Sequence, residues 1–160
     1  MPSSTTPART DFVPVVLGGD IGSYALIREF HEAYGIKSIA MGTGFIGAIT
    51  HSKIAELHHI DAYAERPLLQ GLAEVHERYP ERRIVLVANT DPLIDTLEGM
   101  HDDLPAYVSC TIPPRTAFDA VCDKGTFARL CREHGLEAPR TEVVRLSGTG
   151  PIAPSEIPFP

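Results

Sequence analysis

Short apolar runs recur along this chain, and each is followed by a turn and then by an amphipathic stretch. Pro14–Leu17 leads directly into the glycine-rich turn of residues 18–23, and Ile84–Ala88 leads into the polar turn of residues 89–91. A continuous apolar run before such a turn is typical of a buried parallel strand that feeds a helix. The alternation of strands and helices therefore predicts an α/β fold with a doubly wound, mostly parallel sheet.

Helices are predicted where apolar residues recur at spacings of three, four and seven. One covers Ser23–Tyr34 and is followed by Gly35, where a left-handed residue is expected. A second covers Pro67–Tyr79, and a third begins at Asp123 and is ended by Gly135. The apolar face of the third helix is predicted to consist of Phe127, Leu130 and Cys131.

Shorter elements complete the predicted pattern. A short helix is expected to begin at Pro92 with Asp91 as its N-cap, because aspartate caps helices well and proline fits the first helical position. The remaining strand candidates are Ile36–Met41, Ile54–His58, Tyr107–Cys110 and Thr141–Leu146.

The composition argues against several classes of partner. The 160-residue chain has a formal net charge of −7, which disfavours binding to a nucleic-acid backbone or to an anionic membrane. Its three cysteines show no CxxC spacing, as expected for reduced thiols in a cytoplasmic protein. No apolar run approaches the roughly 20 residues of a membrane span. We therefore expect a cytoplasmic protein without nucleic-acid or membrane partners, and the sequence leaves a homodimer open.

Neither nucleophilic catalysis nor a metal site is indicated by the sequence. The chain has no G-x-S-x-G motif, and its seven histidines include no i, i+4 pair. The glycine turn lacks the G-x-G-x-x-G spacing, and Ala40–Thr43, after the second strand, carries no carboxylate for a ribose. A nicotinamide dinucleotide site is therefore disfavoured, and no catalytic or metal-binding residue is assigned.

The turns that follow the predicted strands Pro14–Leu17 and Ile84–Ala88 are the expected binding loops. Ligands of open α/β sheets bind at the edge where the carboxyl ends of the strands lie. Glycines let a ligand approach the backbone, and a helix N-terminus favours an anion. The alternatives are a tight turn without a ligand for the first loop and simple helix capping for the second. The candidate substrate-binding residues are Gly18, Gly19, Asp20, Gly22, Ser23, Asn89, Thr90 and Asp91.

Lys124 follows Asp123 at the start of the last predicted helix. One interpretation is an N-cap followed by a solvated lysine, and both features are common. The other is that a lysine in a first helical turn reaches a phosphate and adds a point charge beside backbone donors. Residue types alone favour the first interpretation.

Several segments together resemble ATP-grasp carboxylate–amine ligases of the D-aspartate ligase type. The N-terminal segments that carry this resemblance are Val15–Tyr24, Phe30–Ile39, Gly42–Phe45 and Thr50–Ile54. Further on, Cys122–Phe127 and Gly135–Thr141 are similar to a pattern of Asp-Lys, helix and Gly-apolar-x-x-Pro-x-Thr. That pattern is spread widely among ATP-grasp enzymes, including biotin carboxylase and the large subunit of carbamoyl-phosphate synthase. In such enzymes the helix joins an N-terminal α/β domain to the ATP-grasp core.

The resemblance implies a Rossmann-like pre-ATP-grasp domain over residues 13–146, with 123–134 as the joining helix, a flexible tail at 1–12 and a linker at 147–160. It implies that Lys124 contacts ATP phosphates and that the loop of residues 18–23 faces the small carboxylate or amino-acid substrate or the ATP-grasp core. The loop of residues 89–91 would lie at the same rim, as a further candidate for substrate binding. ATP and Mg²⁺ would serve the whole enzyme, and the C-terminal ATP-grasp core would be the missing partner. We expect this chain alone to be inactive and to hold no cofactor.

The implied reaction is phosphorylation of a carboxylate by ATP, followed by attack of an amine on the acyl phosphate to form an amide. Three alternatives stay open. They are a parent enzyme like carbamoyl-phosphate synthase or biotin carboxylase, a stand-alone Rossmann-like module that binds a small anion or a partner, and a dinucleotide-dependent oxidoreductase. The coding sequence after Pro160 would separate the ligases from the stand-alone module, and an NAD(P) titration would test the oxidoreductase.

Overall fold

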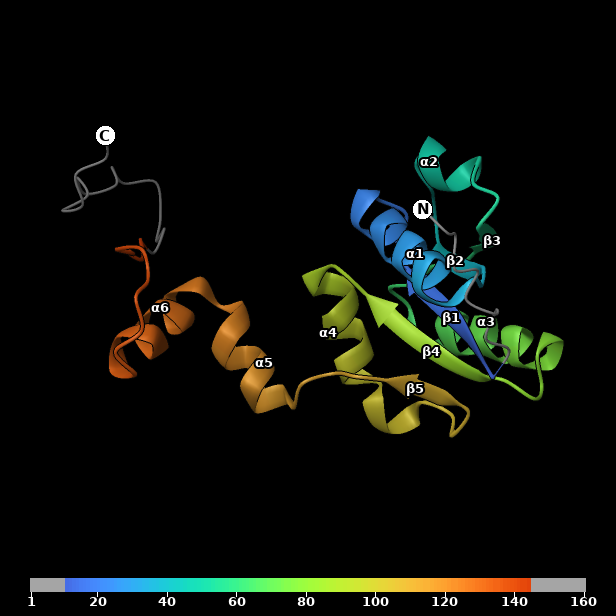
Figure 1. Ribbon diagram of the computed structural model, residues 1–160. Coiled ribbons are helices and arrows are strands. Elements are labelled where there is room, and N and C mark those ends of the chain that lie inside the picture. Colours follow the sequence, from blue (N-terminus) through green and yellow to red (C-terminus); the bar gives the residue numbers. More distant parts are fainter. Residues whose placement is uncertain (1–10, 145–160) are drawn as a thin grey trace, which may run out of the picture. The chain divides into compact units, whose positions relative to one another are not determined.

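The computed structural model describes residues 11–144, which fall into two compact units (Figure 1). The division lies between Ile112 and Pro113. We call residues 11–112 the sheet unit and residues 113–144 the helical unit, and each is described by itself.

The sheet unit is built on five parallel strands. They are β1 (Phe12–Leu17), β2 (Ser38–Gly42), β3 (Ala55–His59), β4 (Arg83–Ala88) and β5 (Val108–Cys110). Their order in the sheet is β3-β2-β1-β4-β5, and every pairing is parallel. This sheet, flanked by helices, confirms the predicted Rossmann-like, doubly wound α/β fold.

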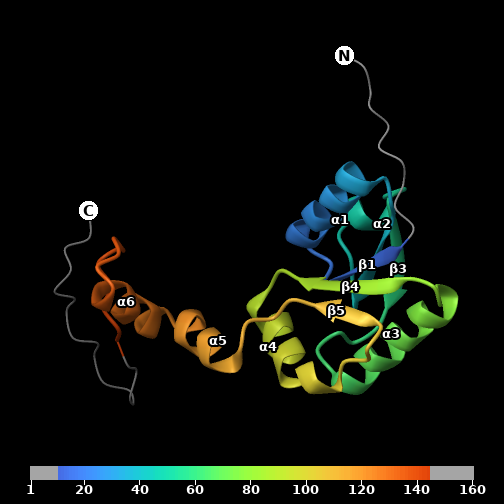
Figure 2. The ribbon, with the colours of Figure 1, turned by 60° about the horizontal axis from the view of Figure 1, so that its bottom comes forward.

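Helices cover both faces of the sheet. They are α1 (Ile21–Tyr34), α2 (Gly47–Thr50), α3 (Glu65–Arg78) and α4 (Asp91–Gly99), followed by the 3₁₀ turn η1 (His101–Asp103). Figure 2 shows α1 and α2 on one side of the sheet and α3 and α4 on the other. Ile27 of α1 shares a buried cluster with Val16, whereas Leu72 of α3 shares one with the neighbouring Val15. Successive side chains of a strand point to opposite faces, so β1 contributes to both clusters.

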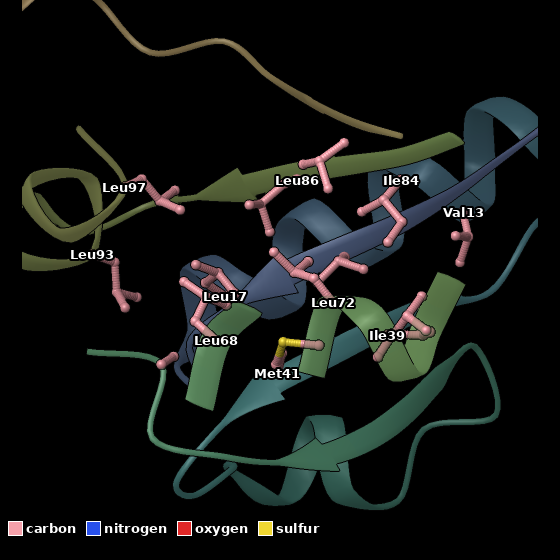
Figure 3. Packing of buried hydrophobic residues seen from close by; sticks show 14 of the residues in the cluster. Val13, Leu17, Ile39, Met41, Leu68, Leu72, Ile84, Leu86, Leu93 and Leu97 are labelled. Carbon is pink, nitrogen blue, oxygen red and sulfur yellow. The ribbon is translucent and has the colours of Figure 1, made fainter. Parts of the chain in front are cut away.

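The larger cluster of buried side chains lies between the sheet and the helices α3 and α4 (Figure 3). Strands contribute Leu17, Met41 and Leu86, and α3 contributes Leu68 and Leu72. β1 is buried along its whole length, as its apolar sequence predicts for a central parallel strand. Full burial of a leucine side chain contributes roughly 1.5–3 kcal/mol, so this cluster dominates the stability of the sheet unit.

The two ends of α1 agree with the sequence. Asp20 is its N-cap, and the carboxylate accepts a hydrogen bond from the Ser23 N–H. Gly35 follows the last residue of the helix with φ = 68°. This confirms the left-handed position expected there, which glycine adopts without the strain that a side chain would bring.

The N-terminus of α4 differs from the prediction by one residue. Thr90, and not Asp91, is the N-cap, because its carbonyl accepts hydrogen bonds from the N–H groups of Leu93 and Ile94. Pro92 is therefore the second residue of the helix. Threonine and aspartate both suit an N-cap, so the sequence could not choose between two adjacent candidates.

The helical unit contains α5 (Arg115–Cys122) and α6 (Lys124–Glu133). No helix was predicted for the stretch that forms α5. Asp123 caps α6 as predicted, and its carboxylate accepts a hydrogen bond from the Thr126 N–H at 2.7 Å. The predicted start of the last helix is thus confirmed.

Two predictions for the helical unit are wrong. Phe127 was expected on the buried face of α6 but is 45% exposed, whereas Ala128 and Cys131 are buried. Spacings of three and four residues both fit one helix face, so the pattern could not fix its rotation. Residues 141–144, the described part of a predicted strand, form no strand.

Some predictions fall outside the described residues. These are the tail over residues 1–10, the end of the last strand candidate at 145–146 and the linker at 147–160. The predicted domain limits therefore stay predictions. Within residues 11–144, no helix combines the length and the apolar character needed to cross a bilayer.

Candidate functional site

The order of the strands changes direction at β1. The chain continues from β1 to β2 and β3 on one side, and places β4 and β5 on the other. Leu17 at the end of β1 pairs with Ala88 at the end of β4, so the loops of residues 18–20 and 89–90 leave the sheet side by side. Ligands of open α/β sheets bind at such a switch point. The structure thus brings the two predicted binding loops together.

Three polar side chains connect these two loops. Asn89 Nδ2 donates to Asp20 Oδ1 at 3.1 Å and lies 3.4 Å from Oδ2. Ser23 Oγ lies 2.9 Å from Asp20 Oδ1 and 3.2 Å from Asn89 Oδ1. The Ser23 N–H also donates to Asp20 Oδ1, at 2.8 Å. Asp20, Ser23 and Asn89 therefore form one network across the switch point.

This network favours the ionised form of Asp20. The pKa of Asp20 is lowered from its usual 3.8, first by the hydrogen bond from the Ser23 N–H and next by that from the Ser23 hydroxyl. Asn89 makes a smaller contribution in the same direction. Hydrogen bonds donated to a carboxylate stabilise its charged form. The positive end of α1 is thus already faced by a carboxylate of the protein itself, which would repel a phosphate placed there.

Ser23 is fully buried at the base of the network. Its hydroxyl has one hydrogen but three oxygen atoms within reach, the third being the carbonyl of Leu17 at 3.4 Å. The ionised Asp20 is the closest of the three and the strongest acceptor. Ser23 is therefore committed to the network and presents little of itself to a ligand.

The glycines of the first loop are explained by contacts within the sheet unit. Gly18 has φ = 104°, which side chains rarely adopt. A Cβ on Gly19 would lie 1.8 Å from the carbonyl oxygen of Gly44, and a Cβ on Gly22 would lie 2.1 Å from Asn89 Nδ2. The contact with the Gly44 backbone requires glycine at position 19, whereas a side chain at position 22 would have to displace the Asn89 amide, so contacts within the protein explain both glycines without a ligand.

A third loop, residues 43–46, lies against the first one. The Ile46 N–H donates to the carbonyl of Gly19 at 2.8 Å. Ile21 and Ile46 are 70% and 37% exposed, so the edge offers apolar surface beside its polar network. No role in the site was predicted for this loop, although Gly42 and Gly44 form a second glycine turn after a strand, which was a signal for one.

Thr90 and Asp91 lie at the start of α4. Thr90 Oγ1 is buried and has no hydrogen-bond partner among the described residues. Asp91 is exposed in the first turn of the helix, where a negative charge is favourable. The second loop therefore adds one unsatisfied hydroxyl and one exposed carboxylate to the edge.

Lys124 lies in the helical unit, exposed at the first position of α6. The Asp123 carboxylate caps the same helix end, and Arg129 is paired with Glu133 at 2.6 Å. A pocket of about 410 Å³ at this end is lined by Asp123, Gly125, Thr126, Arg129 and Val143. The position of Lys124 is compatible with both interpretations drawn from the sequence, a solvated lysine and a phosphate contact.

Within residues 11–144, no three His, Cys, Asp or Glu side chains are arranged to hold a metal ion. The adjacent histidines of β3 have separate partners. His58 Nε2 lies 3.1 Å from a carboxylate oxygen of Glu74, and the His59 ring lies edge-on to Phe45 with 5.0 Å between ring centroids. The described residues therefore offer no cluster that would hold Mg²⁺ by three such side chains.

The strand order and the joined loops define a doubly wound α/β protein with a polar edge at its switch point. No family model matches the sequence. The chain is 27% identical over 139 residues to the D-aspartate ligase of Enterococcus faecium (strain Aus0004). The alignment covers 84% of this chain and 33% of the relative, so the chain spans about one third of that enzyme's length.

Proposed function

We propose that this chain is the N-terminal, substrate-side domain of an ATP-grasp carboxylate–amine ligase similar to D-aspartate ligase, with a role in cell-wall synthesis. The similarity to D-aspartate ligase carries the proposal. Its 139 aligned residues exceed the 112 residues that precede the helical unit, so it includes part of both units. A similarity that reflected only the Rossmann-like fold would not need to extend beyond the sheet unit.

In the proposed reaction ATP phosphorylates the substrate carboxylate and leaves as ADP. An amine then attacks the acyl phosphate, and phosphate leaves as the amide bond forms. The role proposed for this chain is to hold the substrate at the joined loops and to contact ATP phosphates through Lys124. The remaining groups would come from the ATP-grasp core.

The Asp20 carboxylate supports a contact of the first loop with N–H groups of the substrate. The Asp20 carboxylate is ionised at the N-terminus of α1 and repels phosphate groups. The same carboxylate accepts hydrogen bonds from N–H groups, such as those of an amino acid or an amide. We therefore propose that residues 18–23 and 89–91 face the substrate, whereas Lys124 faces ATP.

The coding sequence beyond Pro160 provides the first test. A ligase of this class requires a strand in which a lysine follows an apolar-proline run, then a glycine loop, and acidic and amide residues further downstream. We expect these features to follow. A stop codon directly after Pro160 would contradict the proposal and favour a stand-alone module.

The enzymatic test supplies the full-length protein with ATP, D-aspartate and hydroxylamine, which traps an acyl phosphate as a hydroxamate. We expect D-aspartate-dependent release of ADP and formation of hydroxamate, and no ADP release by the 160-residue chain alone. ADP release that needs bicarbonate instead of D-aspartate would indicate a parent like biotin carboxylase or carbamoyl-phosphate synthase. A folded full-length protein that releases no ADP with either substrate would refute the proposal.

Variants separate the two proposed roles. Asn89→Ala should raise KM for the amino acid more than KM for ATP, and Lys124→Ala should do the reverse. Gln70→Ala is a matched control, because Gln70 is an exposed amide on α3 that donates to Glu74, away from both loops. It should change neither KM.

A further inference from the structure

One side chain joins the loop after β1 to the loop after β4. Asn89 Nδ2 donates to Asp20, and Asn89 Oδ1 faces Ser23 Oγ. A carboxylate can only accept hydrogen bonds, so the amide nitrogen and not the amide oxygen must face Asp20. The network therefore fixes the orientation of the Asn89 amide as well as its position.

Gly22 is shaped to receive this amide. A Cβ on Gly22 would lie 2.1 Å from Asn89 Nδ2 and 3.2 Å from Asn89 Cγ. The absence of a side chain at Gly22 thus leaves the space that Asn89 fills. This steric fit is independent of the hydrogen bonds and identifies the same pair of loops.

The burial of the three residues shows where the connection is made. Ser23 is fully buried and belongs to the packed base of the sheet unit, whereas Asn89 is exposed. An exposed amide has water as an alternative partner, so core packing does not force its contacts with Asp20 and Ser23. Its hydrogen bond to a charged acceptor is of the stronger kind.

We propose that Asn89 is a clasp that holds the loop after β1 against the loop after β4, so that this edge is already assembled before any ligand arrives. In this clasp the Asn89 amide lies within hydrogen-bonding distance of Asp20 Oδ1 and Oδ2 and packs against Gly22. Describing the edge as a substrate-binding edge rests on the proposed function. The clasp itself does not, since its contacts exist without a ligand.

Amide hydrogen exchange of the Ser23 N–H, measured by NMR on this chain without ligand, tests the clasp. Loss of the clasp frees the Asp20 carboxylate that this N–H bonds. Asn89→Ala should therefore accelerate exchange at Ser23 by about fivefold or more, the factor that corresponds to one net hydrogen bond. Gln70→Ala, which removes an exposed amide from α3, should leave this rate unchanged.

Gly22→Ala gives a second test, because helix propensity and the clasp predict opposite changes in the exchange rate of the Ser23 N–H. Alanine is a better helix former than glycine, so helix propensity alone predicts slower exchange in the first turn of α1. The clasp predicts faster exchange, because the new methyl group would expel the Asn89 amide. The double variant should exchange no faster than Asn89→Ala alone.

Several outcomes would overturn the clasp. These are unchanged exchange at Ser23 in Asn89→Ala, slower exchange in Gly22→Ala, or additive effects in the double variant. If Gly22→Ala does not fold, Asn89→Ala alone decides, because an exposed residue is replaced there. None of these measurements requires ATP or an amino acid, so failure of the clasp and failure of the proposed ligase function remain distinguishable.

Discussion

The sheet unit and the helical unit differ in how much apolar surface each can bury. In the sheet unit β1 is buried along its whole length, and helices cover both faces of the sheet. The buried apolar residues of the helical unit, among those described, are Phe118, Ala128 and Cys131. Its exposed large apolar residues are Val121, Phe127, Leu136, Val143 and Val144. The sheet unit therefore carries its own core, whereas the described part of the helical unit leaves most of its large apolar side chains exposed.

Separating the two units should give the largest effect. Residues 11–112 alone should unfold cooperatively in urea, because the main cluster lies within them. Residues 113–160 alone should show no cooperative transition, since units of this size rarely fold without a staple or a partner. Circular dichroism during urea titration measures both. A cooperative transition in the shorter piece would break the comparison.

A matched pair of leucines should give the next largest effect. Leu72 is fully buried in the sheet unit, whereas Leu136 is 62% exposed in the helical unit. Leu72→Ala should reduce the free energy of unfolding by about 2–5 kcal/mol, through lost burial and a cavity. Leu136→Ala should change it by less than about 0.5 kcal/mol. Urea unfolding of the whole chain compares the two, and equal losses would show that Leu136 is covered in solution.

Asp20 should make the stability of the sheet unit depend on pH, and this effect should be smaller than that of Leu72→Ala. Its pKa is below 3.8 in the folded state because Ser23 and Asn89 donate hydrogen bonds to the carboxylate. A lowered folded pKa means that ionised Asp20 stabilises the fold above pH 3.8. That contribution is lost as the pH falls through the folded value. Asp20→Asn keeps an N-cap but should lose this part of the dependence.

Urea midpoints at about pH 5 and about pH 2.5 for wild type and Asp20→Asn measure this difference. Other carboxylates titrate in both proteins, so the comparison isolates Asp20. The wild type should lose more stability than the variant on acidification. Equal losses would show that the network does not favour the ionised carboxylate.

Alkylation of the cysteines should distinguish buried from exposed thiols, and this test does not depend on a change in stability. Burial raises the pKa of the Cys110 thiol to about 11, and Cys131 is buried in the helical unit. Cys122 is exposed. The thiolate is the reactive form, so iodoacetamide at about pH 8 should modify Cys122 first, as mass spectrometry of tryptic peptides would show. Equal labelling of Cys110 would indicate that the β5 edge opens readily.

The sequence determined several of the local elements of this protein, although it predicted neither α2 nor α5. Apolar runs identified β1 and β4, and helical spacing with a following glycine identified α1 and its end at Gly35. The Asp123 cap of α6 was also readable. These features depend on residues close together in the chain, so periodicity and capping preferences report them. These preferences could not identify Thr90 as the N-cap of α4, nor could they fix which face of α6 is buried.

Only the tertiary structure decided which loops meet. Asn89 contacts residues 66 and 69 positions earlier in the chain, and that contact exists because β4 pairs with β1 rather than with β3. It also changed the meaning of the glycine turn, since Gly19 and Gly22 make room for Gly44 and Asn89. Strand order is set by long-range pairing and by the path of the crossovers. A local pattern carries no record of either.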